Sequence, residues 1–150
     1  MTTDYIVSSL PALAFDQPAP IGWAAFAELA GAAADRILDG QWRDLETQLR
    51  NAMAAARGGD KWKREARGCS VYWKNRVLAA FQEKDVAKRD ALIDKVWWDA
   101  AGELTPCASP LGAGALATYA VRLKIALKRT GISTEAGNAV FDRLTAETKI

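Results

Sequence analysis

The chain has 150 residues, of which half are hydrophobic and a quarter are charged, and its net charge is +2 at pH 7. A chain of this length and balance buries enough apolar surface to fold as one domain, residues 1–150, without a metal ion or a disulfide. The sequence contains no histidine, and histidine is the commonest general base and the commonest metal ligand. We therefore expect a protein that is not an enzyme, with no catalytic residues, no bound metal and no cofactor.

Two features bear on where the protein works. Cys69 and Cys107 stand too far apart in the sequence for a zinc-binding pair, and without an export signal we expect two reduced thiols in the cytoplasm. The longest apolar run, residues 111–121, stops at Arg122 and is too short to cross a bilayer. The sequence thus predicts a cytoplasmic protein with no transmembrane segment.

The first half of the chain predicts two long helices behind a lead-in. Residues 4–15 are expected to form a short helix or an extended lead-in, and the prolines of residues 16–20 a stiff linker. Residues 21–38 predict a helix that Gly40 ends as a left-handed cap. Residues 41–57 predict the clearest helix, closed by the glycine pair at 58 and 59. Its apolar positions repeat at three and four: Trp42, Leu45, Leu49, Ala52 and Ala56.

The second half continues the same pattern. Helices are predicted over residues 60–84, 85–101 and 112–128, and a last one begins at Ser133 or Thr134 and runs to about Glu147. No stretch alternates apolar and polar residues for long enough to predict a strand. The predicted fold class is all-α, a bundle of five or six helices with mostly antiparallel neighbours, because the connections are short. Along the chain it divides into a lead-in and linker (1–20), central helices (21–101) and a C-terminal helix pair (112–150).

Residues 112–117, Gly-Ala-Gly-Ala-Leu-Ala, match the glycine pattern of dinucleotide-binding loops. In those loops a strand leads into a tight turn that brings pyrophosphate to a helix N-terminus. Pro106 and Pro110 precede the pattern here, and two prolines are incompatible with a buried parallel strand. We therefore interpret the glycines as the start of a helix that packs closely on a neighbour.

The strongest local charge excess lies in residues 57–76, which hold seven basic residues and two acidic ones. On a helix, Lys63, Arg67 and Lys74 would form one basic stripe beside an apolar seam with Trp62 and Trp73, and both tryptophans are better interpreted as core. A solvated helix face explains such a stripe, and so does a surface for phosphates or for an acidic protein. An aromatic anchor rimmed by cations is also the composition of a binding hot spot. The candidate partner-binding residues are Arg57, Lys61, Trp62, Lys63, Arg64, Arg67, Trp73, Lys74 and Arg76.

Three segments stand out together: DYIVSSLP with FDQPAPI (residues 4–11 and 15–21), WRDLE with LRN (42–46 and 49–51), and LATYAVRLK (116–124). In this order they resemble a family of short, functionally uncharacterised bacterial proteins that are encoded beside V/A-type ATPase subunits. The last segment is also similar to the final helices of the larger socket protein of V/A-type ATPases, an all-helical protein between the rotating central stalk and the membrane ring. This chain is much shorter than the full socket protein, so the resemblance implies architecture and company, and it brings no catalytic residues.

The resemblance implies a non-catalytic accessory or central-stalk component of a V/A-type ATPase, acting by protein–protein docking. Its partners would be stalk or ring-facing subunits, at the cytoplasmic face of the membrane. The alternative from the residues is a nucleic-acid-binding helical module that uses the basic 57–76 segment. Salt separates the two, because nucleic-acid binding weakens steeply as salt rises.

Overall fold

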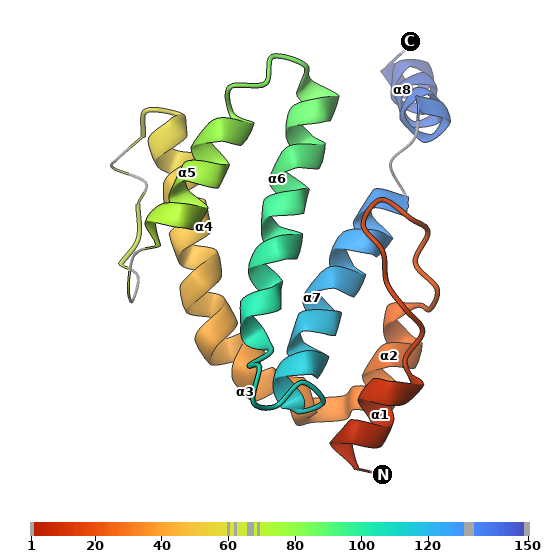
Figure 1. Cartoon of the computed structure of the whole chain (residues 1–150). Coiled ribbons are helices and arrows are strands. Elements are labelled where there is room, and N and C mark those ends of the chain that lie inside the picture. Colours follow the sequence, from red (N-terminus) through yellow and green to blue (C-terminus); the bar gives the residue numbers. More distant parts are fainter. Residues whose placement is uncertain are drawn as a thin grey trace.

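Helices make up most of the computed structural model (Figure 1). The structure describes residues 2–59, 61, 63–65, 68, 70–130 and 134–148, and these ranges contain no strand, which confirms the all-α prediction. Seven α-helices in this part have seven residues or more, against the five or six predicted: α1 (Thr3–Ser9), α2 (Trp23–Ala30), α4 (Arg43–Ala56), α5 (Val71–Ala80), α6 (Val86–Ala101), α7 (Ala113–Thr130) and α8 (Thr134–Thr148).

The chain stays helical from the start of α2 to the end of α4, but it bends twice on the way (Figure 1). The bends fall at a 3₁₀ turn, η1 (Gly31–Ala34), and a π-helical turn, η2 (Leu38–Trp42), on either side of the three-residue α3 (Asp35–Ile37). The predicted helix end at Gly40 is therefore wrong. Gly40 lies inside η2, and the wider π turn carries the chain onward so that Trp42 and Leu45 both face the core.

The predicted end of α4 at the glycine pair is confirmed. Gly58 has a φ of 75°, a conformation that favours glycine. Its N–H donates to the carbonyl of Ala55 at 3.0 Å, and the N–H of Gly59 donates to that of Ala54 at 2.8 Å. This Schellman pair satisfies carbonyls that the last turn of α4 leaves without partners, and it turns the chain away from the helix axis.

The predicted helix over residues 60–84 is shorter than expected, because α5 begins at Val71. Residues 63–65, 68 and 70 are not helical. The side-chain amide of Asn51 on α4 donates to the carbonyl of Arg64 at 2.7 Å and accepts from its N–H at 2.8 Å. Gln48 accepts from the N–H of Ser70 at 3.0 Å, and Ser70 caps α5 through the N–H of Trp73. The connection is thus held against α4 in a non-helical path by α4 side chains.

The long connection makes α4 and α5 parallel neighbours, where short connections had predicted an antiparallel pair. Gln48, midway along α4, lies at the start of α5, and Arg57 at the end of α4 lies 5.5 Å from the ring of Phe81 at the end of α5. By contrast, α6 runs back along α5, and α7 runs back along α6 (Figure 1). A connection that returns along one helix places the next helix parallel to it.

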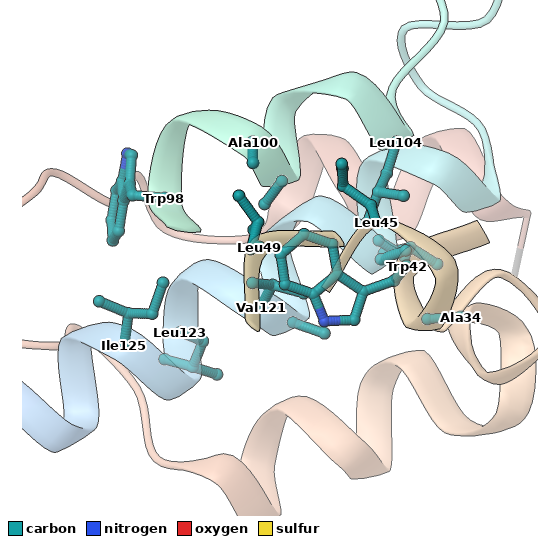
Figure 2. Close-up of a cluster of buried hydrophobic side chains, with 14 of the residues drawn as sticks. Ala34, Trp42, Leu45, Leu49, Trp98, Ala100, Leu104, Val121, Leu123 and Ile125 are labelled. Atoms are coloured by element: carbon teal, nitrogen blue, oxygen red, sulfur yellow. The ribbon is translucent and has the colours of Figure 1, made fainter. Parts of the chain in front are cut away.

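The core lies where α4, α6 and α7 meet near the η2 turn (Figure 2). Leu49, Leu104 and Leu116 are fully buried there. Gly114, in the first turn of α7, packs so closely that a Cβ on it would collide with the carbonyl of Leu104. The interpretation of residues 112–117 as a closely packed helix start is confirmed, since turns and not a strand lead into α7.

Candidate functional site

The basic segment is divided between the connection after α4 and the helix α5. Lys63 and Arg64 are exposed in the connection, Lys74 is exposed on α5, and all three line one small cavity of about 290 Å³ against α4. The predicted helical stripe of Lys63, Arg67 and Lys74 is wrong, because Lys63 does not lie on a helix. Trp62 and Arg67 lie outside the described residues.

Two further members of the predicted site stand at the edges of the connection. Arg57 is the C-terminal cap residue of α4, and its guanidinium lies 5.5 Å from the centre of the Phe81 ring. Lys61 is exposed in the connection itself. Neither residue lines the small cavity that Lys63, Arg64 and Lys74 share. Of the described basic residues of this segment, Lys63, Arg64 and Lys74 line that cavity, whereas Arg57, Lys61 and Arg76 do not.

Trp73 is a core residue and not an exposed anchor. Only 6% of its surface is accessible, and its indole N–H donates to a carboxylate oxygen of Glu103 at 2.6 Å. Arg76, the last of the predicted cations, lies with its guanidinium 5.6 Å from the Trp73 ring and pairs with Asp99 of α6 at 2.9 Å. Trp73 is thus buried and already paired with Glu103 and Arg76, which confirms its interpretation as core and leaves no exposed Trp73 ring to anchor a partner.

The pair of Arg76 and Asp99 joins α5 to α6 electrostatically. Partial burial alone would raise the pKa of Asp99, but hydrogen bonds from Arg76 and Lys95 outweigh it, and the pKa lies below its ordinary value. Burial likewise acts to lower the pKa of Arg76, whereas its bond to Asp99 raises it above the ordinary value. Asp99 is thus a charged carboxylate at neutral pH, held by two cations from two helices.

A groove of about 1060 Å³ lies between α4, α6 and α7. Residues of α4, α6 and α7 line it, and α6 lies between the other two helices (Figure 1); we call the α6 side the floor and the α4 and α7 sides the walls. Met53 on α4, with Ile93 and Trp97 on α6, presents half-buried apolar surface to it. Charges of both signs line its rim: Asp39, Glu46, Arg50, Arg57, Asp90, Lys124 and Lys128.

One end of the groove is fixed by a buried carboxylate. Asp94 of α6 accepts from the ammonium of Lys128 at 2.9 Å and from the guanidinium of Arg129 at 3.1 Å. Arg129 also pairs with Asp16 at 2.9 Å, which ties the segment before α2 to the end of α7. Burial would lower the pKa of Arg129, and the bonds to Asp16 and Asp94 raise it above the ordinary value. These bonds join α6 to the last turn of α7 at the edge of the groove.

In the predicted helix over residues 85–101, the apolar residues Val86, Ile93, Val96, Trp97 and Ala100 predict one stripe, but their spacing does not separate groove-lining from buried members. Val96 and Ala100 of that stripe are buried, whereas Ile93 and Trp97 are half-buried and line the groove. The one available signal was the charged Asp94 inside the stripe. A carboxylate on an apolar face indicates a place where two or more cations converge.

The described residues contain no group of three or more acidic, cysteine or histidine side chains that could hold a metal ion. In the same part of the chain, no helix has the length and hydrophobicity needed to cross a bilayer. Cys107 is an exposed free thiol in the turn before α7, and Cys69 lies outside the described residues.

Comparisons of the chain with models of protein families, with curated proteins and with solved structures gave no match.

Proposed function

We propose that this chain is a non-catalytic docking protein whose groove between α4, α6 and α7 receives a helix from a partner protein. The observation that carries the proposal is the composition of the groove. Half-buried apolar side chains form its floor, charges of both signs form its rim, and a helix wall stands on each side. An amphipathic helix fits such a surface, since its apolar stripe faces the floor and its polar flanks meet the rim.

For the partner, we propose the central-stalk or ring-facing subunits of a V/A-type ATPase, at the cytoplasmic face of the membrane. This part of the proposal rests on the resemblance of the three segments. Support comes from where they lie: the hydroxyl of Tyr119, in the last segment, donates to the carbonyl of Pro11, in the first, at 2.7 Å. Residues of the resembling segments, such as Ile6, Leu45 and Leu116, are also buried. Contacts of this kind are expected where a shared sequence pattern encodes a shared helical architecture.

The nucleic-acid alternative rests on the small cavity lined by Lys63, Arg64 and Lys74. Such a site would bind phosphate oxygens, and its affinity would fall steeply with salt. The groove favours a protein partner instead, because the apolar side chains of its floor offer phosphate oxygens no positive charge and no hydrogen-bond donor.

Recovery of partners from the native cells by tagged full-length protein tests the proposal. Neighbouring residues of α6 supply a matched pair of variants: Ile93 lines the groove, whereas Leu92 is exposed outside it. Wild type and Leu92→Gln should recover V/A-type ATPase subunits. Ile93→Gln should recover about tenfold less, since a buried amide without a partner costs about 1–3 kcal/mol and 1.4 kcal/mol is tenfold in affinity.

Two results would contradict the proposal. Equal recovery by Ile93→Gln and wild type would remove the groove as the docking surface. Recovery of RNA or DNA in place of ATPase subunits, with binding lost at high salt, would favour the basic cavity and the nucleic-acid alternative.

A further inference from the structure

Another cavity, of about 730 Å³, lies next to the groove, where the ends of α4 and α5 meet the start of α6 (Figure 1). We call it the α5-end cavity. Its apolar lining residues are Ala55, Ala56, Leu78, Phe81, Val86 and Ile93, and its polar ones are Arg57, Gln82, Arg89 and Asp90. Sites for small molecules have volumes of about 300–1,000 Å³, mostly apolar walls and a few polar groups. The α5-end cavity has this size and composition.

Two arginines of the α5-end cavity converge on one aromatic ring. The guanidinium carbon of Arg57, from α4, lies 5.5 Å from the centre of the Phe81 ring, and that of Arg89, from α6, lies 6.0 Å from it. Phe81 is half-buried and packs against the hydrophobic core, so the ring is a fixed support. A guanidinium held by the face of a ring keeps its N–H donors in its own plane. Those donors are therefore directed at whatever occupies the cavity beside the ring.

The donors of these two arginines are not used within the part of the chain that the structure describes. There, neither guanidinium has a hydrogen-bond acceptor or an ion-pair partner, and Arg89 is half-buried. The other half-buried arginines of the described residues each donate to a carboxylate or carbonyl oxygen: Arg76, Arg122 and Arg129. Removing a charged donor from water without an acceptor is unfavourable. Arg89 thus lacks an acceptor that a bound anion would supply.

The charges of the lining indicate what kind of anion fits. Asp90 is the acidic lining residue, and its carboxylate lies 3.9 Å from the ammonium of Lys128, outside the cavity. Arg57 and Arg89 against Asp90 leave one net positive charge, which a single negative charge neutralises. A carboxylate carries one charge, and its two oxygens match the paired N–H donors of a guanidinium.

We propose that the α5-end cavity binds a small carboxylic acid, in its anionic form, that carries a hydrocarbon body. The carboxylate accepts hydrogen bonds from Arg89, and the charge of Arg57 attracts it from the side of α4. The hydrocarbon body lies against Leu78, Phe81 and Ile93 and is removed from water there. This site does not rest on the proposed docking function, because it needs no partner protein.

Isothermal titration calorimetry on the full-length protein tests the proposal with three probes. Octanoate has both the carboxylate and the hydrocarbon body, 1-octanol has the same body without the charge, and acetate has the charge without the body. Octanoate should bind the wild type at least about tenfold more tightly than either of the others. The reason is that a hydrogen bond to a charged group, or the burial of two methylene groups, is sufficient for a factor of ten in affinity. This comparison needs no variant.

Two variants of neighbouring residues on α6 locate the binding. Arg89→Gln should bind octanoate about tenfold more weakly or worse, because a hydrogen bond to the carboxylate is lost. Lys88→Gln is the matched control, since it removes the same charge from an exposed position outside the α5-end cavity, and it should bind octanoate as the wild type does. Arg89→Gln breaks no hydrogen bond of the described residues, so its helical content, measured by circular dichroism, should equal that of the wild type.

Four outcomes would overturn the proposal. If the wild type does not bind octanoate at millimolar concentration, the α5-end cavity is no site for such an acid. Equal binding of 1-octanol would show that the arginines have no role, and equal binding of acetate would show that the apolar walls have none. Equal affinities of Arg89→Gln and Lys88→Gln would place the binding elsewhere on the chain. Failure of the proposed docking function leaves all of these measurements unaffected.

Discussion

Substitution of Gly114 by alanine is expected to destabilise the protein, although the same change stabilises most helices. Gly114 lies in the first turn of α7, and in a helix interior alanine is about 1 kcal/mol more favourable than glycine. Here an added Cβ would meet the carbonyl oxygen and carbon of Leu104 and the ring of Pro106. The main colliding atoms belong to backbone, which cannot rotate away as a flexible side chain can.

The magnitude follows from the two opposing terms. An extra methyl group in a well-packed site costs about 1–3 kcal/mol, and collision with backbone atoms places Gly114→Ala at the upper end of that range. After subtraction of the gain in helix propensity, the variant should lose about 2 kcal/mol of unfolding free energy. For a chain of this size 1 kcal/mol corresponds to about 2–4 °C, so the melting temperature should fall by about 4–8 °C.

Gly40→Ala is the matched control. Gly40 also lies in a helical turn, but nothing lies within 4 Å of the position of its added Cβ. This variant should gain up to about 1 kcal/mol. Urea unfolding followed by circular dichroism at 222 nm measures both variants. A Gly114→Ala protein as stable as the wild type would show that α7 does not approach Leu104 as closely as the structure has it, and would refute the packing account of the glycine pattern.

Three further predictions concern the core, the connection and pH. Leu49→Ala should cost about 3–5 kcal/mol in urea unfolding, because Leu49 is fully buried, and Leu92→Ala, at an exposed position, less than about 1 kcal/mol. Asn51→Ala should speed tryptic cleavage after Arg64 by about tenfold, since both hydrogen bonds that hold the connection are lost; an unchanged rate would exclude that role. Asp99→Asn should reduce the unfolding free energy at neutral pH but not in acid. The pKa of Asp99 is lowered by folding, so its contribution is present above about pH 4 and is lost as the pH falls through the folded pKa, and a pH-independent difference between the two proteins would contradict this.

Helices in which apolar residues three and four apart mark one face were predictable from the sequence. In α4 and the turn before it, the spacing of Trp42, Leu45, Leu49, Ala52 and Ala56 predicted the buried side; the first four are buried and Ala56 is half-buried. The start of α6 was also predictable from nearby residues. Asp85 is its N-cap and accepts hydrogen bonds from the backbone N–H groups of Ala87 and Lys88. Such features depend on residues within one or two turns, and a sequence shows them directly.

The non-helical connection was not predictable in this way. Its path depends on Gln48 and Asn51, which bind the backbone of Ser70 and Arg64 from another helix. Spacing alone continued the helix from residue 60 to residue 84, because local pattern does not register competing partners for the backbone. The hydrogen-bond partner of Trp73 was not predictable either, because its indole N–H donates to Glu103, thirty residues further along the chain.

The groove was the least predictable feature. A hollow between three helices depends on their relative directions, and these depend on the parallel arrangement of α4 and α5. Ile93 and Val96 belong to one apolar stripe in the sequence, yet one lines the groove and the other is buried. Periodicity identifies the apolar face of a helix, but it does not show how much of that face the other helices bury.

The contacts between the start of the chain and α7 have a consequence for synthesis on the ribosome. Phe26 stacks on Tyr119 with ring centres 5.4 Å apart, and Pro11 and Asp16 bind Tyr119 and Arg129. α1 and α2 leave the ribosome before α7, and the surface that buries them is about a hundred residues away in the sequence. At a translation rate of about 5–20 residues per second, their apolar side chains wait several seconds for α7. Until α7 emerges, the apolar faces of α1 and α2 are therefore exposed to chaperones and to aggregation.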